Sequence, residues 1–325
     1  MILAGDIGGT TTRLALYDTR NGSRRPVIEQ TYPSRQYAGL CEIAAAFVAQ
    51  HKVKVDRACF GIAGPVQHGR VVTPNLPWVV DSQALALELG VRVVKLINDL
   101  EANAYGIADL DSEDFVTLNA GAPDARGNAA VISVGTGLGE AGLFWDGESH
   151  RPFACEGGHA DFAPRDGLEA ELLCYLVARF QHISYERVLS GPGLRLIYEF
   201  LRDTGRGEEP GWLLEAMGRG DPSATISAFG LEGRSELCVK ALDMFVSFYG
   251  AEAGNLALKT MAIGGVFVGG GIAPRIIKKL QEPLFMAAFT AKGRMQPLMA
   301  AMPVRVIIKD TAALLGAARC AAEMA

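Results

Sequence analysis

The chain has 325 residues, enough for about two domains of ordinary size. Hydrophobic residues make up 49% of it and charged residues 21%, which is usual for a packed globular enzyme. The formal net charge of -5 provides no basic field for binding nucleic acid phosphates, so we expect no nucleic acid partner.

The start of the chain and its cysteines favour a cytoplasmic location. The first residues, Met-Ile-Leu-Ala-Gly-Asp, lack the basic region and cleavage site of a signal peptide. No apolar run approaches the ~20 residues free of Gly and charge that cross a bilayer, so we expect no membrane contact. The six cysteines are far apart and show no C-x-x-C spacing, which favours reduced core thiols over a zinc site.

Short apolar runs and helical patterns alternate through the first third of the chain. We expect strands over residues 2–4, 13–17, 27–31, 58–63 and 91–97, and helices over 40–50 and 82–89. The first two strands flank a glycine turn, which is typical of a hairpin. Asp81 or Ser82 caps the second helix, which stops at Gly90.

The same plan starts again near residue 129. A strand over 129–134, a glycine turn over 135–139 and a strand over 141–145 repeat the arrangement at the N-terminus. The remaining expected elements are helices over 168–180, 193–203, 235–260 and 311–324 and strands over 266–268 and 304–308. The two segments share the order of their elements but not their residues, which hints at a duplicated core.

Strands that alternate with helices predict an α/β protein. Two glycine-turn cores that face each other would leave a cleft between domains, which is a common ligand site. No Pro- or Ser-rich linker separates them, so we expect closely hinged domains that are not contiguous in sequence. We predict a small α/β domain over 1–108 plus about 298–325, and a large α/β domain with helical insertions over 109–297.

Three glycine turns at strand ends are candidates for nucleotide binding, because backbone N–H groups with no Cβ in the way form a phosphate-binding concavity. The predicted contacts are Gly5, Asp6, Ile7, Gly8, Gly9 and Thr10, then Gly135, Thr136 and Gly137, then Gly269, Gly270 and Gly271. Asp6 suits Mg²⁺ through water. Each turn alone could be a plain hairpin. No P-loop motif occurs, and Glu140 breaks the G-x-G-x-x-G pattern, so the set favours another nucleotide-binding plan.

Asn98 and Asp99 end a buried strand, which delivers their side chains to a fixed position. A carboxylate there can accept the proton of a substrate hydroxyl, and an amide can hold a neighbouring hydroxyl. The alternative is that Asp99 is the N-cap of a helix over 100–105. The residues alone favour the helix cap as the role of Asp99.

Two further polar segments suit a sugar. Glu156 and His159 flank a Gly-Gly pair, and they offer an acceptor and a mixed donor to hydroxyls that both donate and accept. A metal site is the rival interpretation, but no further His lies nearby. Glu186, in the run over 182–193, could reach a sugar hydroxyl or pair with an arginine on the surface.

Together and in this order, these motifs resemble those of the bacterial glucokinase family, within the sugar kinase, actin and Hsp70 ATPase fold. The stretches are Gly-Asp-Ile-Gly-Gly-Thr, Ile-Asn-Asp, Gly-Thr-Gly-Leu-Gly, Glu-Gly-Gly-His-x-Asp-Phe, Glu-Arg-Val-Leu-Ser-Gly-Pro-Gly, Gly-Asn-Leu-Ala-Leu and Gly-Gly-Val-Phe-Val-Gly-Gly-Gly-Ile. The resemblance extends from Gly5 to about Gly316. It implies two ribonuclease-H-like domains around an interdomain cleft, and a homodimer. It also implies transfer of phosphate from ATP, with Mg²⁺, to the 6-hydroxyl of glucose at the entry to glycolysis.

The resemblance also implies roles for particular residues. Asp99 would be the general base, and the residues that hold glucose would be Asn98, Glu156, His159 and Glu186, with Asn75 as a further candidate. The first two glycine turns would embrace the ATP phosphates, and the third would lie near the adenosine. The sequence departs from the family pattern at Thr11, where Asn is common, and at Ser133, Val134 and Glu140, which flank the second glycine turn where smaller or apolar residues are expected. Glu140 adds an acid near the expected phosphates. The cysteine-rich zinc motif of the related repressor–kinase branch is absent from the sequence.

Other functions on the same fold are a kinase for another hexose, a non-catalytic sugar sensor or regulator, and a chaperone-type ATPase. A regulator should carry a DNA-binding segment, and we expect none here because the chain starts at the first strand. A chaperone-type ATPase would lack the set Glu156, His159 and Glu186.

Overall fold

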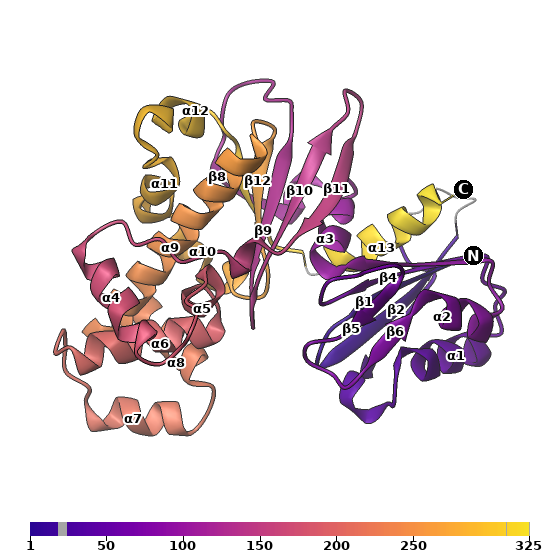
Figure 1. The fold of residues 1–325 in the computed structure, drawn as a ribbon, viewed down its shortest axis with the longest axis horizontal. Coiled ribbons are helices and arrows are strands. Elements are labelled where there is room, and N and C mark those ends of the chain that lie inside the picture. The colour runs from indigo at the N-terminus through magenta and orange to yellow at the C-terminus, as the bar shows by residue number, and fades with distance from the viewer. Residues whose placement is uncertain (19–24, 310, 325) are drawn as a thin grey trace.

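The computed structural model describes residues 1–18, 25–309 and 311–324. Figure 1 shows two lobes, each built on one sheet, with both chain termini on the lobe that holds the first sheet. Within the described ranges, no helix is both long enough and apolar enough to cross a membrane.

The first sheet has the strand order β3-β2-β1-β4-β7. The strands β1 (Ile2–Ile7), β2 (Thr11–Tyr17) and β3 (Ile28–Pro33) form an antiparallel meander, and β4 (Arg57–Ile62) and β7 (Val93–Asn98) run parallel to β1. The parallel part is buried on both faces, which explains why β1 and β4 are continuous apolar runs. A small hairpin, β5 (Arg70–Val72) and β6 (Val79–Asp81), lies outside this sheet.

The helices of the first lobe begin and end where the sequence predicts. Helix α1 (Leu40–His51) connects β3 to β4, and α2 (Ser82–Leu89) precedes β7. Oδ1 of Asp81 accepts the N–H groups of Gln83 and Ala84 at 2.9 and 3.0 Å. Gly90 ends α2 with a φ of 61°, a left-handed conformation that glycine adopts without strain.

The second sheet repeats this order as β11-β10-β9-β12-β13, with β8 added at its edge. Its strands are β8 (Phe115–Asn119), β9 (Ala129–Val134), β10 (Leu138–Trp145), β11 (His150–Cys155), β12 (Gly265–Gly269) and β13 (Val304–Ile307). Again three strands, β9, β10 and β11, form an antiparallel meander. The strand β12 runs parallel to β9, and β13 runs parallel to β12. The repeated plan predicted from the glycine turns is therefore a repeated sheet topology.

Helices fill the second lobe around the long α9 (Glu236–Thr260), which packs on β9 and β12. The others are α4 (Gly167–Val177), α5 (Tyr185–Val188), α6 (Gly191–Asp203), α7 (Gly211–Gly218), α8 (Pro222–Leu231), α10 (Ile277–Leu280), α11 (Pro283–Thr290) and α12 (Gln296–Ala300). Ser235 was expected inside this helix, but it is the N-cap: its hydroxyl accepts the N–H of Cys238, and α9 begins one residue later.

Two helices join the lobes. Helix α3 (Asp99–Ile107) follows β7, and α13 (Ala312–Glu323) packs on α3, β1 and β4. One buried apolar cluster holds residues of both sheets together with α3 and α13. The strand β13 lies in the second sheet, so the chain crosses back to the first sheet after Ile307. The division into domains at 1–108 plus 298–325 stays a prediction.

Candidate active site between the two lobes

The first glycine turn is shorter than the sequence predicts. Gly5, Asp6 and Ile7 lie inside β1, and only Gly8, Gly9 and Thr10 form the turn, which Gly8 closes by donating its N–H to Thr11 O at 2.9 Å. Gly5 is buried, and a Cβ added there would overlap the ring of Phe60. Its lack of a side chain is therefore explained by packing in the core, and we correct its assignment to the turn.

Asp6 pairs with Arg13 across the β1–β2 hairpin, where the register places the two residues opposite each other. Nη2 of Arg13 lies 2.9 Å from Oδ2 of Asp6, and Nε donates to the same oxygen at 3.3 Å. Arg13 was not predicted, although the hairpin register alone points to it. A guanidinium is suited to binding phosphate oxygens.

The residues present suit Mg²⁺ only as an ion that the protein shares with the phosphates of a bound nucleotide. Among the described residues, no group of three or more His, Cys, Asp or Glu side chains could hold a metal by itself. Mg²⁺ commonly keeps several waters and is held by one or two carboxylates together with substrate phosphates. Asp6, at the strand end beside the first turn, fits that mode.

The second and third glycine turns pack against each other at the ends of β9 and β12. Gly135 O accepts the N–H of Gly191 at 2.8 Å, which ties the second turn to the start of α6. A Cβ added at Gly270, which has a φ of 86°, would overlap Val134 O. Gly269 lies in β12, and its carbonyl accepts the hydroxyl of Tyr249 at 2.9 Å, so only Gly270 and Gly271 belong to the third turn.

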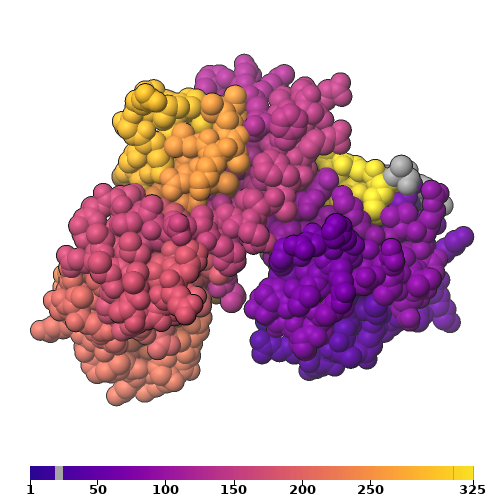
Figure 2. All heavy atoms as spheres, in the orientation of Figure 1, coloured from indigo at the N-terminus to yellow at the C-terminus, as the bar shows by residue number. Residues whose placement is uncertain are grey.

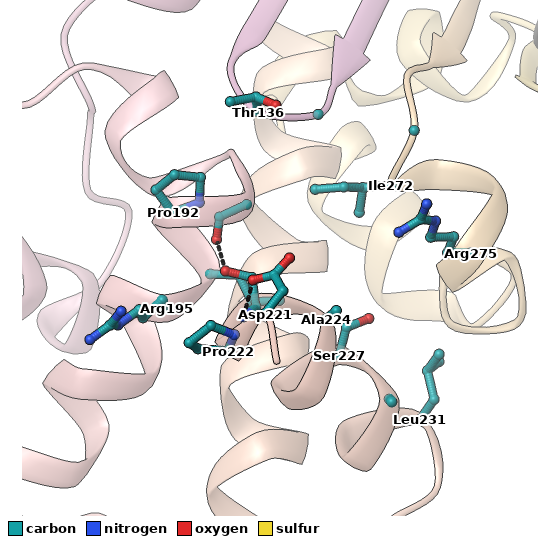
Figure 3. Close-up of a pocket in the computed structure, with 16 residues that line it drawn as sticks. Thr136, Pro192, Arg195, Asp221, Pro222, Ala224, Ser227, Leu231, Ile272 and Arg275 are labelled. Atoms are coloured by element: carbon teal, nitrogen blue, oxygen red, sulfur yellow. Dashed lines mark hydrogen bonds between the residues drawn. The ribbon is translucent and has the colours of Figure 1, made fainter. Parts of the chain in front are cut away.

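A cavity of about 690 Å³ opens beside these turns (Figure 3). Among the predicted nucleotide contacts, Gly135, Thr136 and Gly271 line it. The remaining lining residues are Gly191, Pro192, Leu194, Arg195, Asp221, Pro222, Ser223, Ala224, Ser227, Ala228, Leu231, Ile272 and Arg275. Figure 3 shows Arg195 and Arg275 on opposite sides of the cavity. The walls from α6 and α8 were not predicted, although Ser190-Gly191-Pro192 is a typical helix start.

Three of the predicted sugar-binding side chains lie together. Nε2 of His159 is 4.0 Å from Oε2 of Glu156, and Nδ1 of His159 is 3.9 Å from Oε1 of Glu186. The side chains of His159, Glu156 and Glu186 are 60%, 52% and 35% exposed, respectively, so they are open to a ligand. Glu186 also accepts the N–H of Leu138 at 3.0 Å and lies against Gly137. It thereby connects this group, which we call the sugar triad, with the second glycine turn.

The helix cap that the sequence suggested for Asp99 is provided by Asn98. Asn98 is the N-cap of α3: its Oδ1 accepts the N–H of Leu100 at 2.8 Å, and its Nδ2 donates to Gly64 O at 3.3 Å. Asp99 is the first residue of α3, so the helix-cap alternative applies to its neighbour. A hydroxyl group can still bind Asn98, because an amide oxygen has a second lone pair and its nitrogen a second N–H.

Asp99 lies where the two lobes meet. Burial raises the pKa of Asp99 to about 6, and the negative charges of Asp6 and Glu156 add to the effect, against the N–H of Leu100 that lowers it. A Cβ added at Gly61 would lie 3.8 Å from both Cα of Asp99 and the carbonyl oxygen of Gly5, and the side chain of the next residue, Leu100, lies against Gly139 of the second lobe. Figure 2 shows the surface hollowed between the two lobes.

Asn75 lies against the first glycine turn. A Cβ added at Gly9 would be 2.7 Å from Cβ of Asn75. The loop that carries it is closed by the hydroxyl of Thr73, which donates to Leu76 O at 2.8 Å, and by the buried ring of Trp78. Asn75 is exposed at this place, available to a ligand beside the turn.

A pair of ribonuclease-H-like sheets with glycine turns and polar groups at their junction defines a sugar kinase of the actin-like ATPase fold. The family model described as Glucokinase matches residues 3–324. The chain therefore belongs to the glucokinase family.

Similar proteins agree with this family. A glucokinase from Synechocystis sp. is 44% identical over 346 residues, which cover 99% of this chain and 98% of that protein. The crystal structure of a glucokinase from an Antarctic psychrotroph is 33% identical, with a TM-score of 0.85 over 99% of both chains. At 20% identity, a ROK family glucokinase from Streptomyces griseus, solved with glucose and AMPPNP, shares the fold with a TM-score of 0.64 over 99% of both chains. The predictions of family, fold class and a glucokinase enzyme are confirmed.

Proposed function

We propose that this chain transfers the γ-phosphoryl group of ATP to the 6-hydroxyl of glucose, with Asp99 as the general base. The observation that carries the assignment is the position of Asp99 at the start of α3, which packs between Gly61 of the first lobe and Gly139 of the second. A base at that point lies between a phosphate-binding turn and a group of sugar-binding side chains. A pKa of about 6 keeps it ionised at neutral pH while it remains basic enough to accept a proton.

On the sugar side, Glu156, His159 and Glu186 come from the second lobe and Asn98 from the first. Carboxylates accept hydrogen bonds from sugar hydroxyls, and the imidazole can donate or accept. Fixing the ring in this way would place the 6-hydroxyl at Asp99, which accepts its proton as the oxygen attacks phosphorus. Such positioning supplies much of the rate enhancement in phosphoryl transfer.

On the nucleotide side, the cavity between α6, α8 and the third turn suits the adenosine, with Thr136 and Gly135 toward the phosphates. The N–H groups of Gly9 and Thr10 and the guanidinium of Arg13 would face the phosphates from the first lobe. Mg²⁺ carried by ATP would supply charge neutralisation, with Asp6 as its protein contact through water. Asn75, beside Gly9, is proposed as a contact near the transferred group.

The direct test is Asp99→Asn, which keeps the size of the side chain and removes the base. We expect kcat to fall by about 10²–10⁴-fold, with glucose still bound in a calorimetric titration. Asp124→Asn is the matched control, because Asp124 is exposed and left-handed (φ 57°), a conformation that Asn tolerates. Near-normal turnover of Asp99→Asn would remove the assignment.

The relative rates on different hexoses are a separate matter, because a single hydroxyl contact can decide selectivity. Rates on glucose, fructose, mannose and N-acetylmannosamine in one coupled assay would rank the substrates. The homodimer and the cytoplasmic location stay predictions, and light scattering on the purified chain tests the first.

A further inference from the structure

A pair of buried glutamates lies beneath the sugar triad and has no part in the mechanism described so far. Glu140, in β10, is 1% exposed, and Glu252, in α9, is 0% exposed. Glu140 was expected near the ATP phosphates. Instead, its side chain is buried in the core, near enough to the carboxyl group of Glu252 for each group to shift the pKa of the other.

Two facing carboxyl groups can form a hydrogen bond only if one of them carries a proton. Within the part of the chain that the structure describes, Oε1 of Glu140 and Oε1 of Glu252 accept no hydrogen bond from the protein. A proton on Glu140 would satisfy both oxygens, since it bonds one carboxyl group to the other. Two buried carboxylates without it would repel each other and lack partners.

The pair touches the sugar-binding segments on both sides. A Cβ added at Gly157 would overlap Oε2 of Glu140, so this carboxyl group fills the space under the residue between Glu156 and Gly158. On the other side, Oε2 of Glu252 accepts from Nδ2 of Asn255 at 2.8 Å, and the same nitrogen lies 3.1 Å from the hydroxyl of Tyr185. Tyr185 immediately precedes Glu186.

We propose that Glu140 and Glu252 share one proton and act as positioning residues for glucose, by supporting Gly157 from below and by holding Tyr185, next to Glu186, through Asn255. The inference rests on the proposed function of Glu156, His159 and Glu186. Neither glutamate touches the sugar. Their effect is to fix the distance between the two arms of the sugar triad.

The charges around the pair favour one proton and one negative charge. Burial raises the pKa of Glu140 to about 8, with a further contribution from Glu252, and burial also raises the pKa of Glu252. Lys259 lies 3.8 Å from Oε1 of Glu252 and balances the remaining charge. Other titratable or charged groups that act on this region are Lys292, Cys155, Tyr185, Arg165 and Glu169.

As the pH rises through about 8, the pair loses its proton and the support under Gly157 weakens. The KM for glucose should then rise in the wild type between about pH 7 and pH 9, with a smaller effect on kcat at saturating glucose. Burial also lowers the pKa of Lys292 to about 8, so a pH profile of the wild type alone does not assign the proton. A substitution must do so.

Glu140→Gln is the assigning variant, because an amide donates permanently to Glu252 and does not titrate. We expect it to bind glucose and to lose the alkaline rise in KM. Glu140→Ala removes the support, and its KM for glucose should be roughly tenfold higher at all pH values, with kcat within a few-fold of the wild type. Glu208→Gln, at an exposed glutamate, is the matched control and should behave as the wild type.

Infrared difference spectra between about pH 7 and pH 10 give a readout independent of activity. The wild type should show a protonated carboxyl band at neutral pH that Glu140→Gln lacks. The proposal is overturned if that band is absent from the wild type, if Glu140→Gln keeps the alkaline rise, or if Glu140→Ala leaves KM unchanged. The variant Glu156→Gln separates a failure of this proposal from a failure of the proposed sugar site. An unchanged KM for glucose in that variant would contradict the sugar site itself.

Discussion

Burial and neighbouring negative charges act on Asp99, the side chain proposed as the general base. Because its pKa is raised to about 6, it becomes protonated within the range where the enzyme can be assayed. We expect kcat/KM for glucose to fall about tenfold per pH unit below about pH 6, since only the ionised carboxylate can accept the proton. A pH–rate profile, with circular dichroism to verify folding at each pH, measures this limb. A profile that stays flat down to about pH 4.5 would contradict it.

The raised pKa of Asp99 also lowers the stability of the folded chain at neutral pH. The folded state raises the pKa of Asp99 from 3.8 to about 6, so folding favours its protonated form and ionisation destabilises the fold as the pH rises through this window. Above about pH 6 the full penalty, roughly 1–3 kcal/mol, is present. Asp99→Asn should therefore unfold at higher denaturant concentration than the wild type at about pH 7.5, and at the same concentration at about pH 3, where Asp99 is neutral in both states. A variant less stable at both pH values would show that the side chain contributes packing and not a charge penalty.

At the residue scale, the sequence predicted the polar strand end at Asn98 and Asp99 but favoured the wrong residue for the helix cap. Asn98 and Asp99 were both predicted at a strand end, yet the cap fell to Asn98 because the helix begins one residue earlier than expected. Glu140 was expected near the phosphates. In β10 alternate side chains point to opposite faces, so its side chain enters the core, and only the unseen partner Glu252 explains why an acid is tolerated there.

Helices α3 and α13 form the element pair on which the junction of the lobes depends. They cross at two glycines: a Cβ added at Gly106 would overlap Ala312 O, and one at Gly316 would overlap Ala102 O. These contacts are with backbone atoms, which cannot move aside as a flexible side chain can. The close approach also sets where α3, and hence Asp99, lies against the second sheet.

Gly316→Ala should destabilise the chain by about 1–3 kcal/mol, because the helices must separate to admit the methyl group. Gly218→Ala is the control: it adds the same methyl group at the end of α7, where nothing lies within 4 Å. We expect the control to be neutral or slightly stabilising, by at most about 1 kcal/mol. Urea unfolding of both variants gives the comparison, and equal midpoints would show that the crossing is not tightly packed.

Local patterns predicted most elements, but the short strands β5 and β6, the strand β11 and the edge strand β8 were missed. The cap at Asp81, the stop at Gly90 and the repeated strand–turn–strand plan all follow from neighbouring residues. The strand β8 was not predicted, because its partner β13 lies nearly 190 residues away and nothing local marks the pairing. The cavity walls from α6 and α8 were missed for the same reason: packing against the turns, not local sequence, makes them part of the site.

At the scale of the whole molecule, the two lobes share both proposed ligands. Asp99, Asn98, Asn75 and the first glycine turn come from one lobe, and the sugar triad with the second and third turns comes from the other. The described connection between the lobes runs through α3 and α13, outside the hollow seen in Figure 2. Such an arrangement allows the hollow to narrow around glucose and exclude water, which would otherwise accept the phosphate.

We therefore expect glucose alone to make the molecule more compact and more stable. Saturation to about a hundred times Kd should add about 2.7 kcal/mol to the free energy of unfolding. The radius of gyration from small-angle X-ray scattering should fall upon addition of glucose, but not of sorbitol at the same concentration, because an open-chain polyol cannot bridge the sugar triad and Asp99 as the ring does. Asp99→Asn should close as well, since it keeps the contacts and lacks only the base. Stabilisation without any change in the radius of gyration would mean that the lobes already stand at their closed distance, and that water is excluded by the sugar itself.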